Sequence, residues 1–286
     1  MRRHPTPYFF LLPALIVTTV LIVLPMIYTF WLSLNVNNPL TSSYGFVGLD
    51  NFVEVFQDPY FYITLGNTLY YTAINIPIEL IIGVGLALAI NNLKGERFYR
   101  TVLILPVLLS PIIVGLIWKW MFNANYGVFN EILKLVGVQG PNWLTNPSVV
   151  RIGIITASIW YTLPFTVLVT LASLKTISKT LYEAAKLDGA NTVRRFFHIT
   201  LPSLKNITFI VILFRSMDLI KIFDLVWVMT KGGPGYASES LGTLTYRTAF
   251  QYWQLGRAAS ISYIIFFLSL IISLILIRHI LKSGAD

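Results

Sequence analysis

The sequence contains no cysteine and only three histidines. Without cysteine the chain can form neither a disulfide framework nor a thiolate metal site, and it has no cysteine nucleophile. The histidines, at His4, His198 and His279, are scattered along the chain and form no cluster. These absences exclude disulfide-stabilised secreted domains and thiolate metalloproteins.

Charged residues are also scarce. They make up 12% of the 286 residues, against about 25% in ordinary soluble domains. Hydrophobic residues reach 56%, and the mean hydropathy is +0.71. A soluble fold of this length could not cover so much apolar surface with so few charges, and the same figures exclude a disordered chain. The composition therefore indicates an integral membrane protein.

Six apolar stretches have the roughly 20 residues that a membrane-spanning helix needs. They lie at Tyr8–Leu34, Thr68–Ile90, Thr101–Phe122, Val150–Leu174, Ile207–Met229 and Ala258–Ile280. Several contain proline, which bundle neighbours can accommodate in a membrane. The sequence predicts an all-α bundle of six spans in a single transmembrane domain, residues 1–286.

The basic residues predict the orientation of the bundle, because lysine and arginine are enriched in cytoplasmic loops. Thirteen of the 21 lie before the first span, after the last span, or in the loops after spans two and four: Arg2, Arg3, Lys94, Arg97, Arg100, Lys175, Lys179, Lys186, Arg194, Arg195, Lys205, Arg278 and Lys282. The alternate loops hold only Lys134, Lys231, Arg247 and Arg257. Both termini are therefore predicted to be cytoplasmic.

The inner loop 175–204 is much longer than a helix connection requires. Thr180 and Glu183 have the spacing of a capping box, and Gly189 is suited to end the short helix that would follow. A second short helix is expected after Asn191 or Thr192. Its residue pattern fits two interpretations equally well: a helix with a flat alanine face that docks on another protein, or an amphipathic hairpin lying on the lipid headgroups.

The same loop resembles the EAA motif of the permeases of binding-protein-dependent ATP-binding-cassette (ABC) transporters. That motif reads E-A-A, three residues, G, nine residues and I-x-L-P, and the chain matches it with Glu183-Ala184-Ala185, Gly189, Ile199 and Leu201-Pro202. The runs from Arg100 to Pro106, from Phe223 to Trp227 and from Gly232 to Gly235 are also similar to parts of sugar permeases. The resemblance to MalF-type sugar and glycerol-3-phosphate permeases covers nearly the whole chain.

This resemblance implies the type I ABC importer permease fold and a set of partners. The coupling helix would dock on a separate ATPase through Glu183, Ala184, Ala185, Asp188 and Gly189. A second permease subunit would complete the pathway, two ATPase subunits would bind Mg-ATP, and an extracytoplasmic substrate-binding protein would deliver a sugar. The chain itself would bind no cofactor and no nucleic acid. It would lie among the lipids of a bacterial or archaeal plasma (inner) membrane.

Span five carries four charges at three-residue spacing: Arg215, Asp218, Lys221 and Asp224. Neighbours in this series lie side by side on a helix, and each charge near mid-membrane costs roughly 2.5–3.5 kcal/mol on insertion scales. The series must therefore face away from lipid. It either lines a pathway for a hydroxylated substrate, with Asp218, Lys221 and Asp224 as candidates, or only neutralises itself. Glu79 in span two is expected to be a structural partner of Arg215 or Lys221.

The sequence contains no phosphate-binding loop of the G-x-x-x-x-G-K-[ST] type, so ATP hydrolysis by this chain through a Walker site is excluded. The chain is expected to be a transport subunit and not an enzyme. An ion-coupled secondary transporter is the alternative, favoured by the intramembrane acids and disfavoured by the coupling-helix motif. A membrane scaffold is disfavoured by the span-five charges.

The outer loop Thr230–Arg257 is long and rich in aromatic residues: Tyr236, Tyr246, Tyr252 and Trp253. Tyrosine and tryptophan are common at the centres of protein interfaces. The loop is therefore expected to contact the substrate-binding protein.

Overall fold

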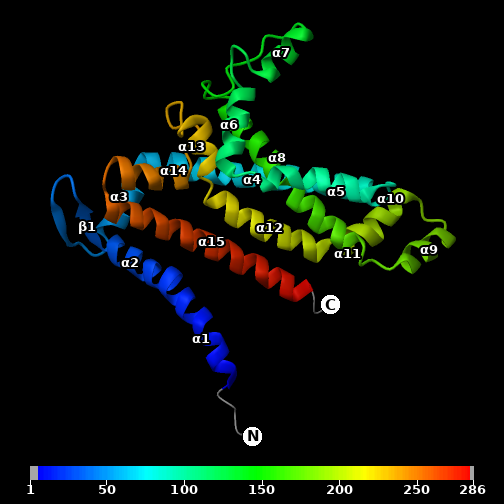
Figure 1. Cartoon of the computed structure of the whole chain (residues 1–286), viewed down its shortest axis with the longest axis horizontal. Coiled ribbons are helices and arrows are strands. Elements are labelled where there is room, and N and C mark those ends of the chain that lie inside the picture. Colours follow the sequence, from blue (N-terminus) through cyan, green and yellow to red (C-terminus); the bar gives the residue numbers. More distant parts are fainter. Residues whose placement is uncertain (1–5, 284–286) are drawn as a thin grey trace. The chain divides into compact units, whose positions relative to one another are not determined.

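The computed structural model describes residues 6–283, which are mostly helical (Figure 1). Arg2 and Arg3, which contributed to the predicted orientation, lie outside these residues. The chain groups into two compact units. The first unit is the chain up to Phe61 together with Leu244–Phe266, and the second unit is Tyr62–Thr243 with the chain from Phe267 onward. Each unit is described by itself.

Several helices are long and apolar enough to cross a membrane. Unbroken candidates are Leu11–Ser33, α4 (Pro59–Asn91), α8 (Val150–Leu174) and most of α15 (Leu255–Ser283). Two further candidates are bent pairs, Glu96–Leu108 with Pro111–Met121 and Thr192–Ser203 with Lys205–Ile220. Counting each pair as one span gives six within residues 6–283, and the predicted all-α membrane fold is confirmed.

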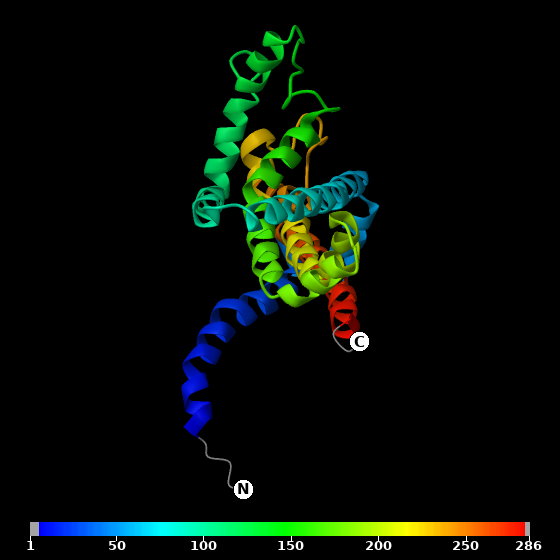
Figure 2. The ribbon, with the colours of Figure 1, turned by 90° about the vertical axis from the view of Figure 1, so that its right-hand side faces the viewer.

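The third span is not the continuous helix that was predicted over Thr101–Phe122. It consists of α5 (Glu96–Ile104) and the 3-10 turn η2 (Leu105–Leu108), followed after a bend of 95° by α6 (Pro111–Met121). In Figure 2, α5 is seen nearly end-on and α6 rises from its end. Leu109 and Ser110 are both extended at the bend, with ψ of 147° and 141°, and at Ser110 the proline that follows disfavours the helical conformation.

The fifth span is also interrupted where a continuous helix over Ile207–Met229 was predicted. Helix α12 (Lys205–Ile220) stops, and α13 (Asp224–Thr230) begins after a break of three residues. A broken helix at membrane depth leaves backbone groups that need new partners. Here Ser240 Oγ donates to the carbonyl oxygen of Ile222 at 2.6 Å.

Two π-helical turns precede prolines. The turn η1 (Thr19–Val23) separates α1 (Thr6–Thr18) from α2 (Leu24–Ser33), and η3 (Phe196–Thr200) separates α10 (Thr192–Arg195) from α11 (Leu201–Ser203). Each turn ends two residues before a proline, Pro25 and Pro202 respectively. A proline ring crowds the carbonyl four residues earlier, so a locally widened helix accommodates it without a sharp break.

The first unit contains a short hairpin of two strands, β1 (Asn35–Asn38) and β2 (Ser43–Phe46), which pair antiparallel with Asn35 opposite Phe46. This hairpin leads into α3 (Asp50–Gln57). Asn51 Nδ2 donates to the carbonyl oxygens of Ser33 and Asn35 at 2.9 and 3.0 Å. One buried side chain thus fastens α3 to the end of α2.

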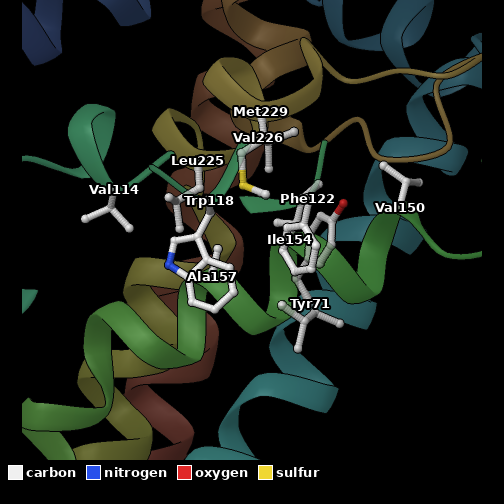
Figure 3. Close-up of a cluster of buried hydrophobic side chains, with 11 residues drawn as sticks. Tyr71, Val114, Trp118, Phe122, Val150, Ile154, Ala157, Leu225, Val226 and Met229 are labelled. Atoms are coloured by element: carbon white, nitrogen blue, oxygen red, sulfur yellow. The ribbon is translucent and has the colours of Figure 1, made fainter. Parts of the chain in front are cut away.

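The core of the second unit gathers where α4, α6, α8 and α13 meet (Figure 3). Its buried members come from all four helices: Tyr71, Val114, Trp118, Val150, Ile154, Ala157, Leu225, Val226 and Met229. At the opposite end, a smaller cluster joins Ala87 and Ile90 of α4 to Leu171 of α8. The remaining helices are α7 (Val128–Leu135), α9 (Lys179–Leu187), α14 (Leu241–Tyr246) and the π turn η4 (Arg247–Gln251).

The close approach of α4 to α8 gives a test of this packing. A Cβ at Gly83 would come within 2.5 Å of Thr166 Cγ2, whereas a Cβ at Gly85 of the same helix meets nothing within 4 Å. Both alanine substitutions gain the same helix propensity. We expect Gly83→Ala to destabilise the protein by about 1–3 kcal/mol through overpacking and to lower its melting midpoint in detergent. Gly85→Ala, the matched control, should not; equal midpoints would contradict this packing.

Candidate transport cavity and docking helix

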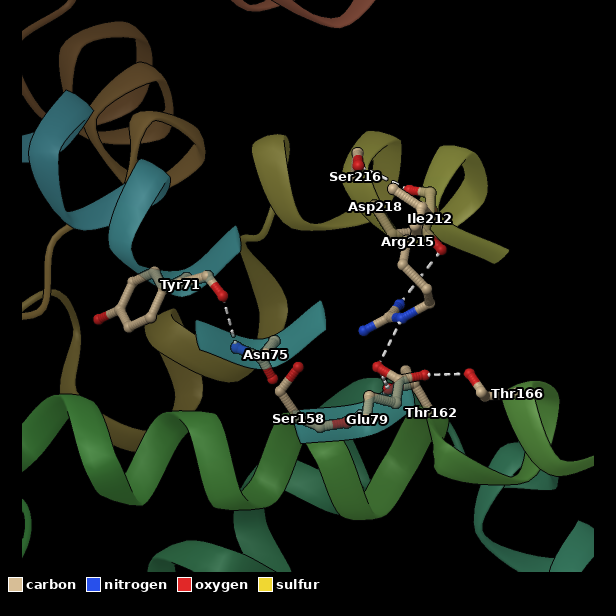
Figure 4. A network of polar contacts seen from close by, with 10 residues as sticks. All are labelled: Tyr71, Asn75, Glu79, Ser158, Thr162, Thr166, Ile212, Arg215, Ser216 and Asp218. Atoms are coloured by element: carbon tan, nitrogen blue, oxygen red, sulfur yellow. Dashed lines mark hydrogen bonds and ion pairs between the residues drawn. The ribbon is translucent and has the colours of Figure 1, made fainter. Parts of the chain in front are cut away.

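A buried ion pair joins two membrane helices of the second unit. Arg215 Nε of α12 donates to Glu79 Oε2 of α4 at 2.9 Å, and the two side chains are 5% and 1% exposed. Thr166 and Thr162 of α8 donate to the same carboxylate at 2.7 and 3.2 Å. Figure 4 shows Glu79 between these donors. The expectation that Glu79 is a structural partner of Arg215 is confirmed.

The charge series continues from this pair toward open space. Arg215 Nη1 lies 3.5 Å from Asp218 Oδ2, and Lys221 Nζ lies 3.5 Å from Asp218 Oδ1. The predicted side-by-side arrangement is therefore present for these three residues. The side chains of Asp218 and Lys221 are 56% and 64% exposed, so their charged groups remain accessible to solvent or to a ligand. Asp224 stands apart from the ladder because it begins α13, after the helix break.

These side chains line a cavity of about 370 Å³ at the break between α12 and α13. Asp218, Lys221 and Asp224, the three pathway candidates from the sequence, all contribute to it. The opposite wall comes from α8 and presents Ser158, Tyr161 and Thr162. The cavity thus combines charged groups, hydroxyls and the aromatic rings of Tyr161 and Phe223, a mixture that suits a hydroxylated ligand.

The docking loop departs from the sequence-based expectation at its start. Ser178 is the N-cap of α9, and its hydroxyl accepts from the amide of Thr180 at 3.3 Å. The predicted capping box of Thr180 with Glu183 is therefore wrong, because the N-cap is Ser178 and the helix begins two residues earlier than expected, at Lys179. As a result the Glu183 side chain lies exposed on the helix surface, where it is available to another molecule.

The end of α9 is as predicted. Gly189 has φ +76°, and the amides of Gly189 and Ala190 donate to the carbonyls of Lys186 and Ala185 at 3.1 and 2.9 Å. This pair of bonds is the Schellman arrangement, in which glycine takes the left-handed position without strain. Asn191 then caps α10 by accepting from the amide of Arg194 at 2.8 Å.

The surface of α9 is open. Ala184 and Asp188 are exposed, and Leu187 is 90% exposed at the end of the helix. In Figure 1, α9 projects beyond the end of α5. The five docking candidates, Glu183, Ala184, Ala185, Asp188 and Gly189, are thus brought together on one short helix and its cap.

Only part of the outer loop Thr230–Arg257 is exposed at the protein surface. Its segment from Tyr236 to Leu241 is held against α4: Asn67 Nδ2 donates to the carbonyl of Tyr236 at 3.0 Å, and Tyr71 Oη donates to the carbonyl of Ser238 at 2.8 Å. Tyr252 and Trp253 are exposed, at 46% and 42%. The expected contact with a binding protein remains a prediction for these two residues.

Sequence reasoning missed the role of Ser240 and Gly242. Gly242 lies against the same break as Ser240, since a Cβ there would meet the carbonyl oxygen of Ile222 at 2.7 Å. The sequence feature that could have indicated this role is the polar run Ser238-Glu239-Ser240, in a loop otherwise expected to be at the surface. No cluster of three or more metal-ligating side chains is found within residues 6–283.

A helical membrane protein with interrupted spans, a charged cavity at one interruption and an exposed short helix on a loop belongs to the class of membrane transport components. The model of the family "binding-protein-dependent transport system inner membrane component" matches residues 79–285. The chain belongs to this family, and it is a transport permease.

Curated relatives carry names of the same kind. The chain is 38% identical over 256 residues to the trehalose/maltose transport system permease protein MalF of Thermococcus litoralis, covering 89% of this chain and 85% of that protein. It is 35% identical to the sulfoquinovosyl glycerol transport system permease protein SmoG of Agrobacterium fabrum, covering 94% and 88%. It is 32% identical to the sn-glycerol-3-phosphate transport system permease protein UgpA of Yersinia pestis, covering 96% and 93%.

The fold also matches solved structures. A chain of a bacterial ABC transporter involved in the import of the acidic polysaccharide alginate superposes with a TM-score of 0.84 at 24% identity, covering 97% of this chain and 95% of that one. A chain of the MetNI methionine ABC transporter gives a TM-score of 0.57 at 16% identity, covering 77% and 94%. None of these relatives is named as an ion-coupled transporter, and that alternative finds no support.

The buried pair yields a stability prediction. Glu79→Leu leaves Arg215 without its buried partner, a change that costs about 3–5 kcal/mol in comparable sites. Asp218→Asn removes a carboxylate that is 56% exposed and lies 3.5 Å from both Arg215 and Lys221, so its loss should cost only about 0–1 kcal/mol. We expect a large drop in melting midpoint and in membrane abundance for Glu79→Leu and little change for Asp218→Asn.

The double variant Glu79→Leu with Arg215→Leu serves as the control, because replacing both members of a buried pair by apolar groups is often neutral. It should recover most of the lost stability. A single variant as stable as the wild type, or a double variant no better than the single one, would show that the pair does not hold α4 and α12 together.

Proposed function

We propose that this chain is the permease subunit of an ABC importer that carries a sugar or an oligosaccharide, or a glycosylated glycerol of similar chemistry. The observation that carries the proposal is the α12–α13 cavity, which places Asp218, Lys221 and Asp224 opposite Tyr161 and hydroxyl groups. Hydroxylated ligands exchange hydrogen bonds with such groups, and a tyrosine ring can stack on a sugar face. The names of the relatives, which refer to carbohydrates and glycerol derivatives, agree with this chemistry.

The proposal assigns α9 as the helix that docks on a separate ATPase. Its EAA face is small and uncovered, and Gly189 lets the chain turn back immediately after it. A flat face of alanines allows a partner to approach closely, and Glu183 and Asp188 at its borders can accept hydrogen bonds. ATP and Mg²⁺ would bind to that partner, so this chain needs no cofactor of its own.

The assembly would contain this permease, a second permease subunit, two ATPase subunits and an extracytoplasmic substrate-binding protein. The family description supports the dependence on a binding protein. Tyr252 and Trp253 are the exposed aromatic residues that would meet it on the outer face. The distribution of lysine and arginine supports cytoplasmic termini, and α9 would then lie on the same side of the membrane as the ATPase.

The coupling role predicts a specific phenotype for Gly189→Val. A β-branched residue at φ +76° is strained, and no neighbour lies within 4 Å of its Cβ, so the effect is confined to the backbone of the turn. We expect normal membrane insertion but loss of the ATPase partner on co-purification, or at least a tenfold loss of substrate-stimulated ATPase activity. Glu183→Lys should reduce partner binding in the same assay.

Gly95→Val is the matched control. Gly95 has φ +88° and equally open surroundings, but it lies outside the EAA loop. It should suffer the same strain and retain the ATPase. If both glycine variants lose the partner alike, or if Gly189→Val and Glu183→Lys transport like the wild type, the docking role of α9 is wrong.

The cavity proposal predicts the result of a charge swap. Asp218→Lys places a third cation between Arg215 and Lys221 and should lower abundance and transport. Adding Lys221→Asp restores charge balance between positions three residues apart, so abundance should return. Because the swap reverses the charges that face the cavity, transport of the radiolabelled substrate should stay at least tenfold lower. Full recovery of transport would show that the charges only neutralise each other.

A further inference from the structure

A second, larger cavity of about 1000 Å³ lies beneath the docking helix in the second unit. Its walls come from the ends of α4 and α8, the start of α5, and the loop from α9 to η3. It shares no lining residue with the cavity at the α12–α13 break. The cavity beneath α9 is therefore separate from the candidate transport cavity and needs its own explanation.

The cavity carries an excess of positive charge. Of its charged lining residues, Lys175 and Glu96 neutralise each other, with Lys175 Nζ at 2.6 and 2.8 Å from the two carboxylate oxygens. The other three are Lys179, Lys186 and Arg195, all basic. None of them forms an ion pair with any residue in the described part of the chain.

The rest of the lining is about half apolar and half polar. The apolar part comes from Leu88, Leu174, Ile177, Val193, Phe196 and Phe197, and the polar part from Asn91, Asn92, Tyr182, Thr192 and Thr200. Val193 and Phe197 are 63% and 56% exposed. One cavity therefore offers cations and hydrocarbon surface together, on a loop next to the ends of membrane-spanning helices.

The cavity lies on one face of α9. Lys179, Tyr182 and Lys186 line it, at the three- and four-residue spacing of one helix face. At about 100° per residue, Ala184 and Asp188 point nearly the opposite way, whereas Glu183 lies beside Lys179 and Lys186 at the border of the basic face. A protein that docks on the side of Ala184 and Asp188 would therefore leave most of the basic face uncovered.

We propose that this cavity binds the headgroup of an anionic phospholipid, with the phosphate beside Lys179, Lys186 and Arg195 and the acyl chains along the apolar wall. A soluble anion would satisfy the cations but leave Val193 and Phe197 exposed, and an apolar ligand would leave the charges unpaired. Basic pockets at the cytoplasmic ends of membrane helices are suited to anionic headgroups. A bound lipid would hold α9 at a fixed depth while its other face stays free.

The test uses the full chain, purified with its co-expressed partners and reconstituted in nanodiscs of phosphatidylcholine with a minor share of phosphatidylglycerol. Lipid retained after detergent extraction is then counted per chain by mass spectrometry. The wild type should retain phosphatidylglycerol in preference to phosphatidylcholine. The triple variant K179Q/K186Q/R195Q should lose at least tenfold, since each basic contact is worth about a fivefold change in affinity.

The triple variant K94Q/R97Q/R194Q is the matched control, because it removes the same charge from neighbouring basic residues that do not line the cavity. It should retain lipid as the wild type does. Equal loss in both triples would indicate unspecific attraction to the membrane surface, and no loss in the first would exclude the site. Either result overturns the proposal.

Two further experiments complete the test. The first distinguishes a lipid site from a site for any anion, and the second separates loss of the site from misfolding of the triple variant. Millimolar inorganic phosphate should not displace the retained lipid; full displacement would assign a plain anion site instead. Lys186→Glu alters one exposed side chain, so it keeps the test valid if the triple variant fails to fold, and it too should reduce retention. The readout requires neither transport nor ATPase docking, so its outcome is independent of the proposed importer function.

Discussion

An arginine buried within a membrane-spanning helix must be paired, and in this chain the partner of Arg215 is Glu79. The pair, with two threonine hydroxyls on the same carboxylate, brings three helices to one point: α4, α8 and α12. A slip of α12 by even one residue would separate the guanidinium from the carboxylate and leave both charges unpaired at high cost. The pair therefore sets the register of α12, and this register determines which side chains reach the cavity.

Because Arg215 is fixed on the buried side, the charges after it emerge progressively. Asp218 lies one helical turn further and is half exposed, and Lys221 is more exposed still. The break after Ile220 then redirects the chain, so that Asp224 starts a new helix at the same cavity. The sequence had left pathway and self-neutralisation as equal alternatives. The structure contains elements of both, since the inner member of the series is structural and the outer members border open space.

The parts of the fold that the sequence predicted are those with a strong local cause. Hydropathy predicted the spans, the three-residue spacing predicted the ladder, and glycine in the EAA loop predicted the end of α9. The breaks in spans three and five were not predicted, because an average over an apolar window does not register the local effect of Pro111 on Ser110. The break after Ile220 has no proline at all. It depends on Ser240 and Gly242, which come from a distant loop, and a sequence window contains no information about such a tertiary partner.

Helix α9 and the cavity are linked by a single run of chain. From the cap at Gly189 the chain passes through α10, η3 and α11 and bends by 60° into α12. Arg215 follows about 15 Å further along that helix at 1.5 Å per residue. Hydrogen-bonded helix is stiff, and the hydroxyls of Tyr182 and Thr200, 2.9 Å apart, brace α9 against this run. If a partner displaced α9, this run of chain is the covalent route by which the motion would reach the Glu79 pair. The exposed charges and the break after Ile220 lie directly beyond that pair, so a change between outward and inward access would alter the cavity there.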